Sequence, residues 1–356
     1  MRIAVGLSGG VDSSVAALLL LRQGHEVAGV AMKLWPGPEA PAAVRSACFG
    51  PDEAGDIRAA ADVCAKLGIP LHVIDCSGHF ERLVLEDLRD GYAAGTTPNP
   101  CVRCNPLVKF GALPEGARAA GLVFDRFATG HYARVARDER SGRWVLKRAV
   151  DAAKDQSYFL YRLGQTQLAA ALFPLGELPK ARVRAIAREA GLAVHDRKES
   201  QDFYAGDLGE LVGPGPGDGD IVDREGRVLG RHRGACRYTV GQRKGLGIAW
   251  PVPLYVLSID APRNRLVVGP ESETLRRSAV VRDCVWGPFE ALSAPAAVLV
   301  KVRSAGRLAR ATISPLAGGL CRVDLAEPVA AVAPGQSAVF YDADTVIGGG
   351  VIGSAG

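Results

Sequence analysis

The stretch Gly6-Leu7-Ser8-Gly9-Gly10-Val11-Asp12-Ser13-Ser14 decides the fold of the N-terminal half of this chain. It ends an apolar run over residues 2–7 with the pattern of a buried strand, and it opens a helical pattern over residues 12–22. A strand, a glycine turn and a helix in this order aim backbone N–H groups and the positive helix end at one point. The glycines let the backbone approach a phosphate, and the serines can add hydroxyl donors. The stretch therefore predicts an anion-binding loop.

The loop lacks the lysine that follows the glycines of a Walker A loop and reaches the β and γ phosphates. This absence is compatible with an enzyme that attacks the α-phosphorus of ATP and holds pyrophosphate as the leaving group. A glycine turn that serves only the connection from strand to helix is the alternative. We interpret the loop as an adenylation site whose acceptor is left open.

Short β-branched runs and helical patterns alternate through the first two hundred residues. Strands are predicted at residues 2–7, 26–32, 71–75 and 124–128, and helices at residues 12–22, 53–67, 80–90 and 109–120. This alternation predicts a doubly wound α/β domain around a buried parallel sheet. Because ligands bind at the carboxyl ends of parallel strands, the loops after Leu7, Met32 and Ala128 are expected to converge on one site.

The second half of the chain has a different pattern. A further helix is predicted at residues 181–190, and the Gly- and Pro-rich residues 213–219 mark a boundary region. From Arg231 onward, short alternating segments separated by turn residues predict mostly β structure with a small barrel; they lie at residues 254–259, 265–268, 298–302, 309–313 and 337–341. We predict a catalytic domain at residues 1–205, a small central domain at residues 206–275 and a C-terminal β-barrel at residues 276–356.

Composition excludes several classes of protein. The 356 residues are 48% hydrophobic and 23% charged, as in ordinary globular proteins. A net charge of +5 fits an anionic partner but falls short of a dedicated nucleic-acid-binding module. The longest apolar stretch, residues 15–21, is too short to span a bilayer, and eight cysteines without a secretory signal indicate reduced thiols. We expect a cytoplasmic protein with no membrane partner.

A second chemical motif is Thr97-Pro98-Asn99-Pro100-Cys101-Val102-Arg103-Cys104-Asn105. Its prolines predict a rigid loop that is not helical through Pro100. A C-x-x-C in a cytosolic protein can be a redox pair, half of a metal site, or a nucleophile with its neighbour, and Arg103 would favour the thiolate. Two incidental thiols are the alternative.

These motifs resemble known families. Residues 8–13 contain the SGGxDS signature of the PP-loop ATP pyrophosphatases, which include synthetases of NAD, GMP and argininosuccinate and tRNA-modifying enzymes. Residues 97–105 resemble the TPNPDxxCN loop of the tRNA 2-thiouridylases. Further matches to that family are GHY at residues 130–132, KDQSYF at 154–159, FPLG at 173–176, GQRKGLG at 241–247, EPVAA at 327–331 and PGQ at 334–336. The chain is thus similar to these enzymes over all three predicted domains.

The resemblance implies ATP-dependent 2-thiolation of a tRNA wobble uridine. ATP with Mg²⁺ would adenylate the C2 oxygen, AMP and pyrophosphate would be released, and a sulfur-donor protein would supply sulfur as a persulfide or sulfide relay. Cys104 would be the sulfur-transferring cysteine; Cys101, where the chain departs from the family, is a second catalytic candidate on its own chemistry. The implied ATP site is Gly6, Leu7, Ser8, Gly9, Gly10, Val11, Asp12, Ser13, Met32 and Gly130. The implied tRNA contacts are Asn99, Pro100 and Cys101 at the target base, with His131, Lys154, Asp155, Gln156, Arg303 and Gln336 elsewhere.

Several of these residues also have a plain structural interpretation. Met32 follows an apolar strand and could be core packing. Lys154 and Arg303 could be solvated surface charges, and His131 could be a structural histidine.

The chain departs from the family pattern at three places. The residue three before the nucleophilic cysteine is commonly Asp in the family and is Cys101 here. The usual partner cysteine, expected shortly after residues 198–200, is missing, and Tyr204 is nearest to its place. Lys301-Val302-Arg303 stands where the family commonly continues Arg-Tyr-Arg, so an aromatic stacking contact and a second phosphate contact are lost.

Without the partner cysteine, the usual persulfide and disulfide cycle cannot run. One route places Cys48, Cys101 and Cys104 as three ligands of an iron–sulfur cluster whose remaining iron holds sulfide. The other places a persulfide on Cys104, resolved by Cys101 as a local disulfide. The other cysteines are assigned elsewhere: Cys64 and Cys76 to the core of the first domain, and Cys236, Cys284 and Cys321 to the later domains.

Two other functions stay open from the sequence. A PP-loop adenylating ligase acting on a small molecule would use the same phosphate loop but would need neither the C-x-x-C nor a β-rich second half. A catalytically idle tRNA-binding relative would explain the missing cysteine, although the intact phosphate loop argues against idleness. Pyrophosphate release that depends on added tRNA would separate the 2-thiouridylase from both.

Overall fold

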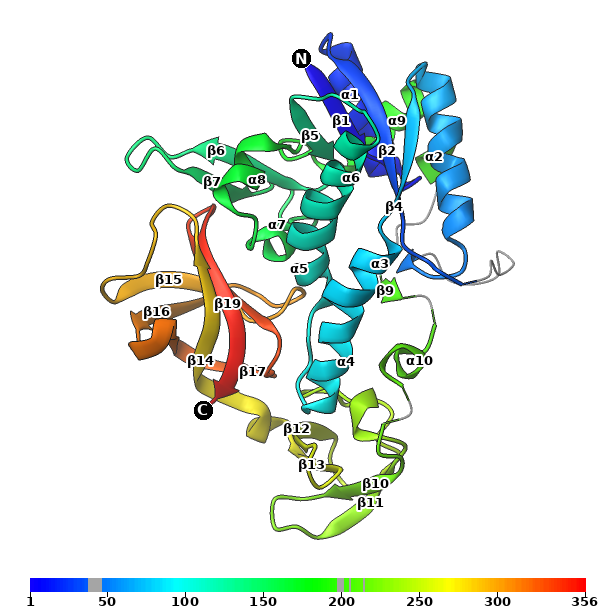
Figure 1. The fold of residues 1–356 in the computed structure, drawn as a ribbon. Coiled ribbons are helices and arrows are strands. Elements are labelled where there is room, and N and C mark those ends of the chain that lie inside the picture. Colours follow the sequence, from blue (N-terminus) through cyan, green and yellow to red (C-terminus); the bar gives the residue numbers. More distant parts are fainter. Residues whose placement is uncertain (38–46, 197–201, 205, 214) are drawn as a thin grey trace. The chain divides into compact units, whose positions relative to one another are not determined.

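The computed structural model describes residues 1–37, 47–196, 202–204, 206–213 and 215–356 (Figure 1). The chain forms two compact units. The first consists of Met1–Val84, Cys101–Gly206 and Asp344–Val346, and the second of Leu85–Pro100, Asp207–Ala343 and Ile347–Gly356. Each unit is therefore assembled from segments that are distant in the sequence.

A five-stranded parallel sheet forms the centre of the first unit, in the order β4-β2-β1-β5-β8. The strands are β1 (Arg2–Gly6), β2 (Glu26–Lys33), β4 (Leu71–Asp75), β5 (Arg126–Thr129) and β8 (Ala171–Leu172). The order reverses between β1 and β5, which confirms the predicted doubly wound arrangement and puts a ligand-binding position at that reversal. The sequence did not indicate β8, because a strand of two residues shows no alternation.

Helices connect the strands of the first unit. α1 (Val11–Arg22), α2 (Glu53–Leu67) and α9 (Lys180–Glu189) agree with the predicted helices to within one residue at each end. Shorter segments are α3 (Ser77–Phe80), the π-helix η1 (Glu81–Leu85), α5 (Pro100–Cys104), the π-helix η2 (Asn105–Ala112), α6 (Leu113–Ala119), α7 (Ser157–Leu160), α8 (Gln165–Ala170) and the 3₁₀-helix η3 (Ala193–Asp196). Within the described ranges, no helix is long and apolar enough to cross a membrane.

The prediction of a rigid loop over residues 97–105 is wrong from Pro100 onward, whereas residues 97–99 are not helical, as predicted. Helix α5 begins at Pro100 and runs on through η2 and α6 to Ala119. A proline is tolerated in the first turn of a helix, because its missing N–H would have no intrahelical acceptor there. The two thiols of the C-x-x-C therefore lie one turn apart on a helix, with Asn105 Nδ2 donating to Cys101 O at 3.0 Å and to Phe159 O at 3.1 Å.

Helix α1 is buried on two sides. Ala17 and Leu20 belong to the core cluster that includes the strand residues of the sheet, whereas Val15 packs in a second cluster with Val183 and Ile186 of α9. Burying an aliphatic side chain of this kind contributes about 1.5–3 kcal/mol. The first turn of α1, which ends the glycine loop, is thus held from two directions.

Two small strand pairs complete the first unit. β6 (Ala133–Arg137) and β7 (Trp144–Arg148) form an antiparallel hairpin, and Thr345–Val346 at the start of β19 pair with β7. β3 (Ala47–Phe49) pairs in parallel with β9 (Asp202–Tyr204). The second pair brings Cys48 next to the strand that ends at Tyr204.

The second unit contains a mixed four-stranded sheet and a barrel. The mixed sheet has the order β11-β10-β13-β12, with β10 and β13 parallel and the other pairs antiparallel. Its strands are β10 (Gly219–Val222), β11 (Val228–His232), β12 (Leu254–Asp260) and β13 (Arg265–Pro270). Helices α4 (Glu86–Ala93) and α10 (Leu208–Val212) and the 3₁₀ turns η4 (Ala235–Arg237) and η5 (Glu271–Thr274) also belong to this unit.

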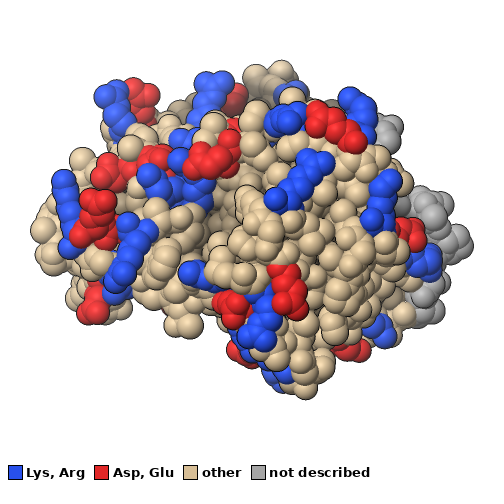
Figure 2. All heavy atoms as spheres, turned by 90° about the horizontal axis from the view of Figure 1, so that it is seen from above, with Lys and Arg blue, Asp and Glu red and all other residues tan. Residues whose placement is uncertain are grey.

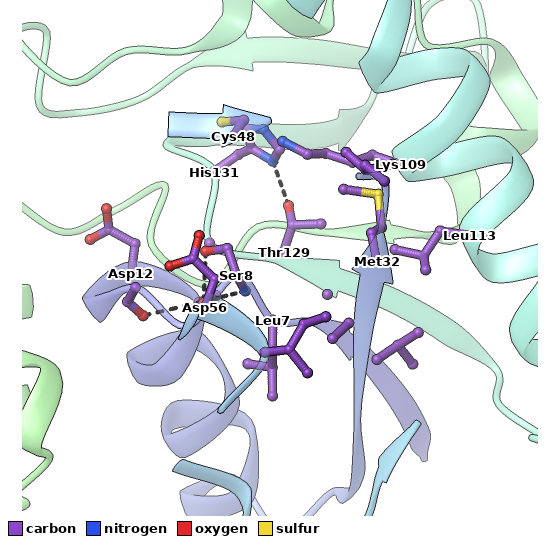
Figure 3. Close-up of a pocket in the computed structure, with 18 of the residues that line it drawn as sticks. Leu7, Ser8, Asp12, Met32, Cys48, Asp56, Lys109, Leu113, Thr129 and His131 are labelled. Carbon is purple, nitrogen blue, oxygen red and sulfur yellow. Dashed lines mark hydrogen bonds between the residues drawn. The ribbon is translucent and has the colours of Figure 1, made fainter. Parts of the chain in front are cut away.

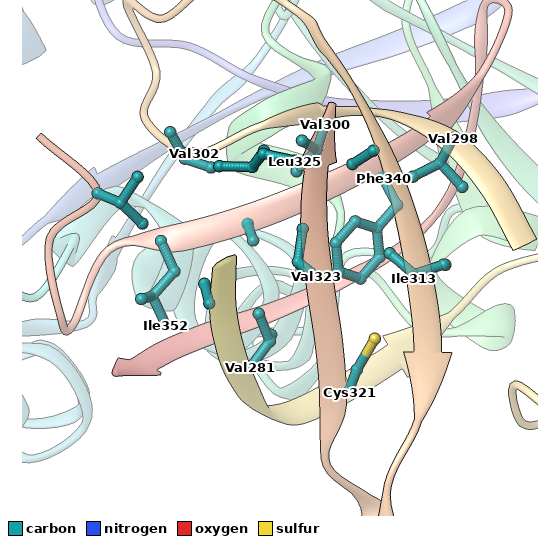
Figure 4. Packing of buried hydrophobic residues seen from close by; sticks show 14 residues of the cluster. Val281, Val298, Val300, Val302, Ile313, Cys321, Val323, Leu325, Phe340 and Ile352 are labelled. Atoms are coloured by element: carbon teal, nitrogen blue, oxygen red, sulfur yellow. The ribbon is translucent and has the colours of Figure 1, made fainter. Parts of the chain in front are cut away.

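The predicted C-terminal β-barrel is confirmed. Six strands follow in the order β14-β17-β16-β15-β18-β19, and the pairing of β14 with β19 closes the ring. They are β14 (Leu275–Trp286), β15 (Ala296–Lys301), β16 (Ala309–Pro315), β17 (Cys321–Ala330), β18 (Ser337–Asp342) and β19 (Thr345–Ala355), with the 3₁₀ turn η6 (Ala317–Gly319) before β17. Inward-facing side chains fill it, among them Val281, Val300, Ile313, Val323, Phe340 and Ile352 (Figure 4).

Candidate active site

The loop between β1 and α1 is closed by hydrogen bonds among its own groups. Gly9 has a φ of 69°, a left-handed conformation that favours glycine. Ser8 N donates to Ser13 Oγ at 3.2 Å, and the two hydroxyl oxygens lie 3.3 Å apart. Gly10 O accepts hydrogen bonds from Ser13 Oγ at 3.3 Å and from Ser14 Oγ at 2.8 Å. Of the three serines, Ser8 and Ser13 line the cavity described next, and Ser14 does not.

A cavity of about 260 Å³ opens beside this loop (Figure 3). The loops after β1, β2 and β5 all contribute to its wall, as expected for the carboxyl ends of parallel strands. From the predicted ATP site it is lined by Gly6, Leu7, Ser8, Gly10, Val11, Asp12, Ser13, Met32 and Gly130, and from elsewhere by Cys48, Glu53, Lys109, Thr129, His131 and Gln156. Only Gly9 of the predicted ATP residues does not line the cavity.

Gly130 is the point at which the loop after β5 meets the glycine loop. A Cβ at this position would lie 2.5 Å from Ser13 N and 2.7 Å from the carbonyl carbon of Asp12. Any larger residue would force the two backbones apart, so glycine is required for the close approach.

Asp12 is held by two residues that are distant in the sequence. Lys180 Nζ donates to Asp12 Oδ1 at 2.7 Å and to Oδ2 at 2.8 Å, and the Tyr132 hydroxyl donates to Oδ1 at 2.9 Å. The Lys180 side chain is 10% exposed and that of Asp12 is 27% exposed. The sequence analysis missed Lys180. The sequence feature that could have pointed to Lys180 is its place at the start of a predicted helix, where the helix dipole disfavours a cation.

Glu53, at the start of α2, fixes the chain that follows β2. Its carboxylate accepts the N–H of Leu34 at 2.7 Å and that of Trp35 at 3.0 Å. Burial raises the pKa of Glu53, and these two hydrogen bonds oppose the rise without cancelling it. Because Leu34 and Glu53 both line the cavity, this contact sets the shape of one wall.

His131 and Lys109 lie together on the part of the wall nearest to Cys48 (Figure 3). His131 Nδ1 is 2.7 Å from Thr129 Oγ1. Burial, and after it the Lys109 cation, hold the pKa of His131 well below its ordinary value. His131 is therefore neutral at pH 7. Its imidazole can donate one hydrogen bond and accept another without adding charge to the cavity.

The C-x-x-C thiols are protonated at neutral pH. Burial raises the pKa of Cys101 to about 12 and that of Cys104 to about 11, while Lys109 lowers both. Burial lowers the pKa of Lys109, but Cys48, Cys104 and Cys101 outweigh it and the net shift is upward. Lys109, which the sequence did not single out, is thus a cation that acts on both thiols.

The three predicted metal ligands, Cys48, Cys101 and Cys104, all interact electrostatically with Lys109. In the parts of the chain that the structure describes, no group of three or more His, Cys, Asp or Glu side chains is arranged to hold a metal ion. Three thiols suit an iron–sulfur cluster chemically.

Comparison with known proteins identifies the family. Residues 1–204 match the tRNA methyl transferase HUP domain, residues 209–270 the tRNA methyl transferase PRC-barrel domain and residues 276–352 the aminomethyltransferase beta-barrel domain. The chain is 43% identical to the tRNA-specific 2-thiouridylase MnmA of Endomicrobium trichonymphae over 99% of both chains. It is 45% identical to the proteins of the same name from Trichormus variabilis and Geobacter metallireducens, over 99% of this chain and 98% and 97% of theirs.

The chain belongs to the tRNA-specific 2-thiouridylase family. Members of this family named above match it over 99% of its length, and the three matched domains follow one another along the chain. The expectation drawn from the motifs is confirmed at the level of the family.

The predicted tRNA residues of the first unit differ in their surroundings. The Asp155 side chain is 1% exposed, lies 3.3 Å from Arg148 Nε, and accepts hydrogen bonds from Ser157 and from the backbone of Ala149. Gln156 lines the cavity and its Oε1 accepts the N–H of Tyr132 at 2.9 Å. Asp155 is thus committed to the fold. Lys154 is half-buried and His131 is in the cavity wall.

The predicted tRNA residues of the second unit are also unlike one another. Arg303 is exposed in the turn after β15. Gln336 Nε2 donates to Thr97 O at 2.9 Å, so its amide anchors the segment that contains Asn99 and Pro100. On the face drawn in Figure 2, Lys and Arg side chains lie interspersed with Asp and Glu among the described residues. The described residues of that face therefore form no continuous positively charged patch of the kind that binds nucleic acid.

The region of the missing 2-thiouridylase cysteine is partly described. Residues 198–200, after which it was expected, lie outside the described residues. Tyr204 lies in β9, and its ring centre is 6.0 Å from that of Phe49 in β3. Phe49 follows Cys48 directly, so Cys48 is the cysteine nearest in the fold to the strand in which the partner was expected. The expectation of Cys64 and Cys76 as core residues is confirmed, because they are 2% and 1% exposed.

Proposed function

We propose that this protein is an ATP-dependent tRNA-uridine 2-sulfurtransferase that adenylates the C2 oxygen of a wobble uridine and replaces this oxygen by sulfur. The observation that carries the proposal is a single cavity lined by the phosphate loop and by Lys109, the cation that acts on Cys101 and Cys104; the two thiols themselves do not line it. Activation by ATP and delivery of sulfur must reach the same substrate atom, so Cys104 has to gain access to this space during the reaction. The products would be 2-thiouridine, AMP and pyrophosphate.

In the adenylation step, residues 6–13, Met32 and Gly130 would bind ATP. The loop N–H groups and the hydroxyls of Ser8 and Ser13 would hold the pyrophosphate as it leaves. Mg²⁺ would supply neutralising charge to the phosphates. Lys109 and the neutral His131 would border the reacting uracil and exclude water from it.

In the sulfur step, a persulfide on Cys104 would be the nucleophile. Its outer sulfur attacks C2 and AMP leaves with the C2 oxygen, which joins the base to Cys104 by a disulfide. The Cys101 thiolate then attacks Cys104 Sγ, forms the Cys101–Cys104 disulfide and releases the 2-thiouridine sulfur. A cellular thiol reductant would restore both thiols, and a sulfur-donor protein would load Cys104 again. Thiols one helical turn apart support this exchange.

The iron–sulfur route is the alternative for the sulfur step, with Cys48, Cys101 and Cys104 as ligands. Anaerobic reconstitution with iron and sulfide, followed by analysis of both elements, would decide between the routes. The persulfide route expects no stoichiometric iron, and it expects Cys48→Ala to retain thiolation in air. Bound iron and sulfide that disappear in Cys48→Ala would overturn it.

The remaining assignments follow from the same proposal. Asn99 and Pro100, with Cys101, would lie at the target base, and His131, Lys154, Asp155, Gln156, Arg303 and Gln336 would position the tRNA directly or through the residues they hold. Residues 1–205 would be the catalytic domain, 206–275 the central domain and 276–356 the barrel domain. The eight free cysteines support a reducing compartment, the cytoplasm.

The test of the function is pyrophosphate release with and without unmodified tRNA. We expect release from ATP only when tRNA is present, together with 2-thiouridine in digested tRNA once a sulfur source is added. Release without tRNA would favour a ligase acting on a small molecule. Absence of release under all conditions would favour an idle tRNA-binding relative.

The variant Cys104→Ser tests the order of the two steps. We expect it to release pyrophosphate with tRNA but to form no 2-thiouridine, because activation of the oxygen precedes attack by sulfur. Thiolation at the normal rate in Cys104→Ser would place the nucleophile at another residue.

A further inference from the structure

Asp12 is a negative charge inside a loop that is built to hold phosphates. Asp12 lines the cavity together with Ser8 and Ser13 of the same loop. Like charges repel more strongly in a partly buried cavity than in water. An uncompensated Asp12 would therefore oppose the same ligand that the loop N–H groups and the positive end of α1 attract.

Lys180 compensates this charge from outside the cavity. Its ammonium contacts both carboxylate oxygens of Asp12, at 2.7 and 2.8 Å, and it lies 5.6 Å from the centre of the Tyr132 ring. Lys180 does not line the cavity, so Asp12 lies between it and the ligand space. The Tyr132 hydroxyl, 2.9 Å from Oδ1, fixes the carboxylate from a second direction. Asp12 is thus both neutralised and held in one orientation.

The position of Lys180 is costly for the fold. It is 8% exposed, and it stands in the first turn of α9, where the helix dipole disfavours a cation. The surrounding structure holds it there: Lys180 N donates to Asp151 Oδ2 at 2.9 Å, and α9 packs on α1 through Val183 and Ile186. A lysine buried for stability alone would be replaceable by an apolar residue of similar size together with its partner. The site of the pair, on the phosphate loop, indicates a role in binding.

We propose that Lys180 is a positioning residue for ATP: by pairing with Asp12 it removes the negative charge from the phosphate loop and, with Tyr132, fixes the loop in its phosphate-accepting form. This inference rests on the proposed function in one respect, namely that the loop binds ATP. It assigns to Lys180 no contact with the nucleotide.

The test measures ATP binding by calorimetry in four proteins: wild type, Lys180→Met, Asp12→Asn and the double variant Asp12→Asn/Lys180→Met. The net charge of positions 12 and 180 together is zero in the wild type and in the double variant. It is negative in Lys180→Met and positive in Asp12→Asn. We expect Lys180→Met to weaken ATP binding at least about tenfold, because the negative charge of the Asp12 carboxylate is then no longer compensated. The double variant should bind ATP more tightly than Lys180→Met, because it contains no uncompensated carboxylate, and added salt should shrink the deficit of Lys180→Met.

Two further measurements separate this role from damage to the fold. Binding of AMP, which lacks the β and γ phosphates, should change less than binding of ATP in Lys180→Met. Lys66→Met, at an exposed lysine outside the cavity, is the matched control and should bind ATP as wild type does. If Lys180→Met does not fold, as judged by its melting curve, Lys180→Gln takes its place in every comparison, because glutamine removes the charge but keeps a hydrogen-bond donor.

The outcomes distinguish this inference from the proposed function. A double variant that folds but binds ATP as weakly as Lys180→Met, or equal losses for AMP and ATP, would show that Lys180 acts only on structure. A wild-type protein that binds no ATP would instead refute the proposed function.

Discussion

At the scale of single residues, the chemistry of this site depends on how charges are compensated. Lys109 is surrounded by three sulfur atoms, and Lys180 is bound to Asp12 with little access to solvent. Lys109 favours the anionic form of Cys101 and Cys104, because an opposite charge nearby stabilises ionisation. Removing one member of either pair should therefore change the reactivity or stability of the other.

The reactivity of Cys104 should report its raised pKa. Burial raises that pKa to about 11, so only about one thiol in ten thousand is ionised at pH 7. Since the thiolate is the reactive form, alkylation by iodoacetamide should accelerate about tenfold for each pH unit up to about pH 10. Lys109→Met should lower the rate at every pH, because the loss of the cation raises the pKa further. Peptide mass spectrometry measures the rate, and a plateau near pH 8 would contradict the assignment.

Substitution of Asp12 should affect folding as well as catalysis. Asp12→Ala leaves the ammonium of Lys180 unpaired at 10% side-chain exposure, and we expect a loss of about 2–4 kcal/mol in the free energy of unfolding. From its sequence position alone, Asp12 would be expected to tolerate alanine without effect on the fold. Urea denaturation measures the loss. Ser8→Ala is the control, because Ser8 is exposed and should change stability by less than about 0.5 kcal/mol.

At the scale of elements, the site is formed by loops that rigid elements bring into contact. Helix α1 is packed against the sheet on one side and against α9 on the other, so the glycine loop has a fixed base. The loop after β5 approaches it so closely that Gly130 has no room for a side chain. The shape of the ATP cavity thus depends on backbone contact between two loops.

Gly130→Ala tests this contact. The added methyl group would lie 2.5 Å from Ser13 N, so one loop must move, and we expect a cost of about 1–3 kcal/mol with loss of ATP binding. Gly78→Ala in α3 is a matched control, because a Cβ there meets nothing within 4 Å. Thermal unfolding and nucleotide binding measure both effects. Equal behaviour of the two variants would show that the loops can separate freely.

At the scale of the whole molecule, each unit joins segments that are far apart in the sequence. In the second unit, Thr97 N donates to Pro334 O at 2.8 Å and Thr97 O accepts from Gln336 Nε2 at 2.9 Å. Gly335 has a φ of 91° and packs on the Thr97 backbone. The turn after β17 therefore anchors the segment that leads into the C-x-x-C helix.

Gly335→Ala should loosen this anchor. A Cβ at Gly335 would lie 2.7 Å from Thr97 N, and the positive φ adds strain to any L-residue. We expect faster hydrogen exchange of the Thr97 amide, measured by mass spectrometry of the peptide that contains it. Gly353→Ala in β19 is the control, because a Cβ there makes only an ordinary contact, 3.5 Å from Val280 O. Unchanged exchange at Thr97 would mean that the segment is held without the turn.

The sequence by itself determined the features that depend on neighbouring residues. Alternation and helical spacing are local, and they predicted the parallel sheet, helices α1, α2 and α9, and the β-rich second half. The phosphate loop is also local, since one short stretch contains its glycines, its serines and the start of its helix. The convergence of the three loops followed from a general property of parallel sheets, and the cavity confirms it.

Only the tertiary structure decided which side chains act on the motifs. Lys180 meets Asp12 across 168 positions of sequence, and Lys109 acts on the thiols of Cys101 and Cys104. The helix at Pro100 also escaped the sequence analysis, because a proline in a first turn cannot be told from one in a loop without knowing where the helix begins. Such contacts depend on packing between distant segments, which local patterns do not encode. The partners that compensate the charges of this site were therefore visible only in the fold.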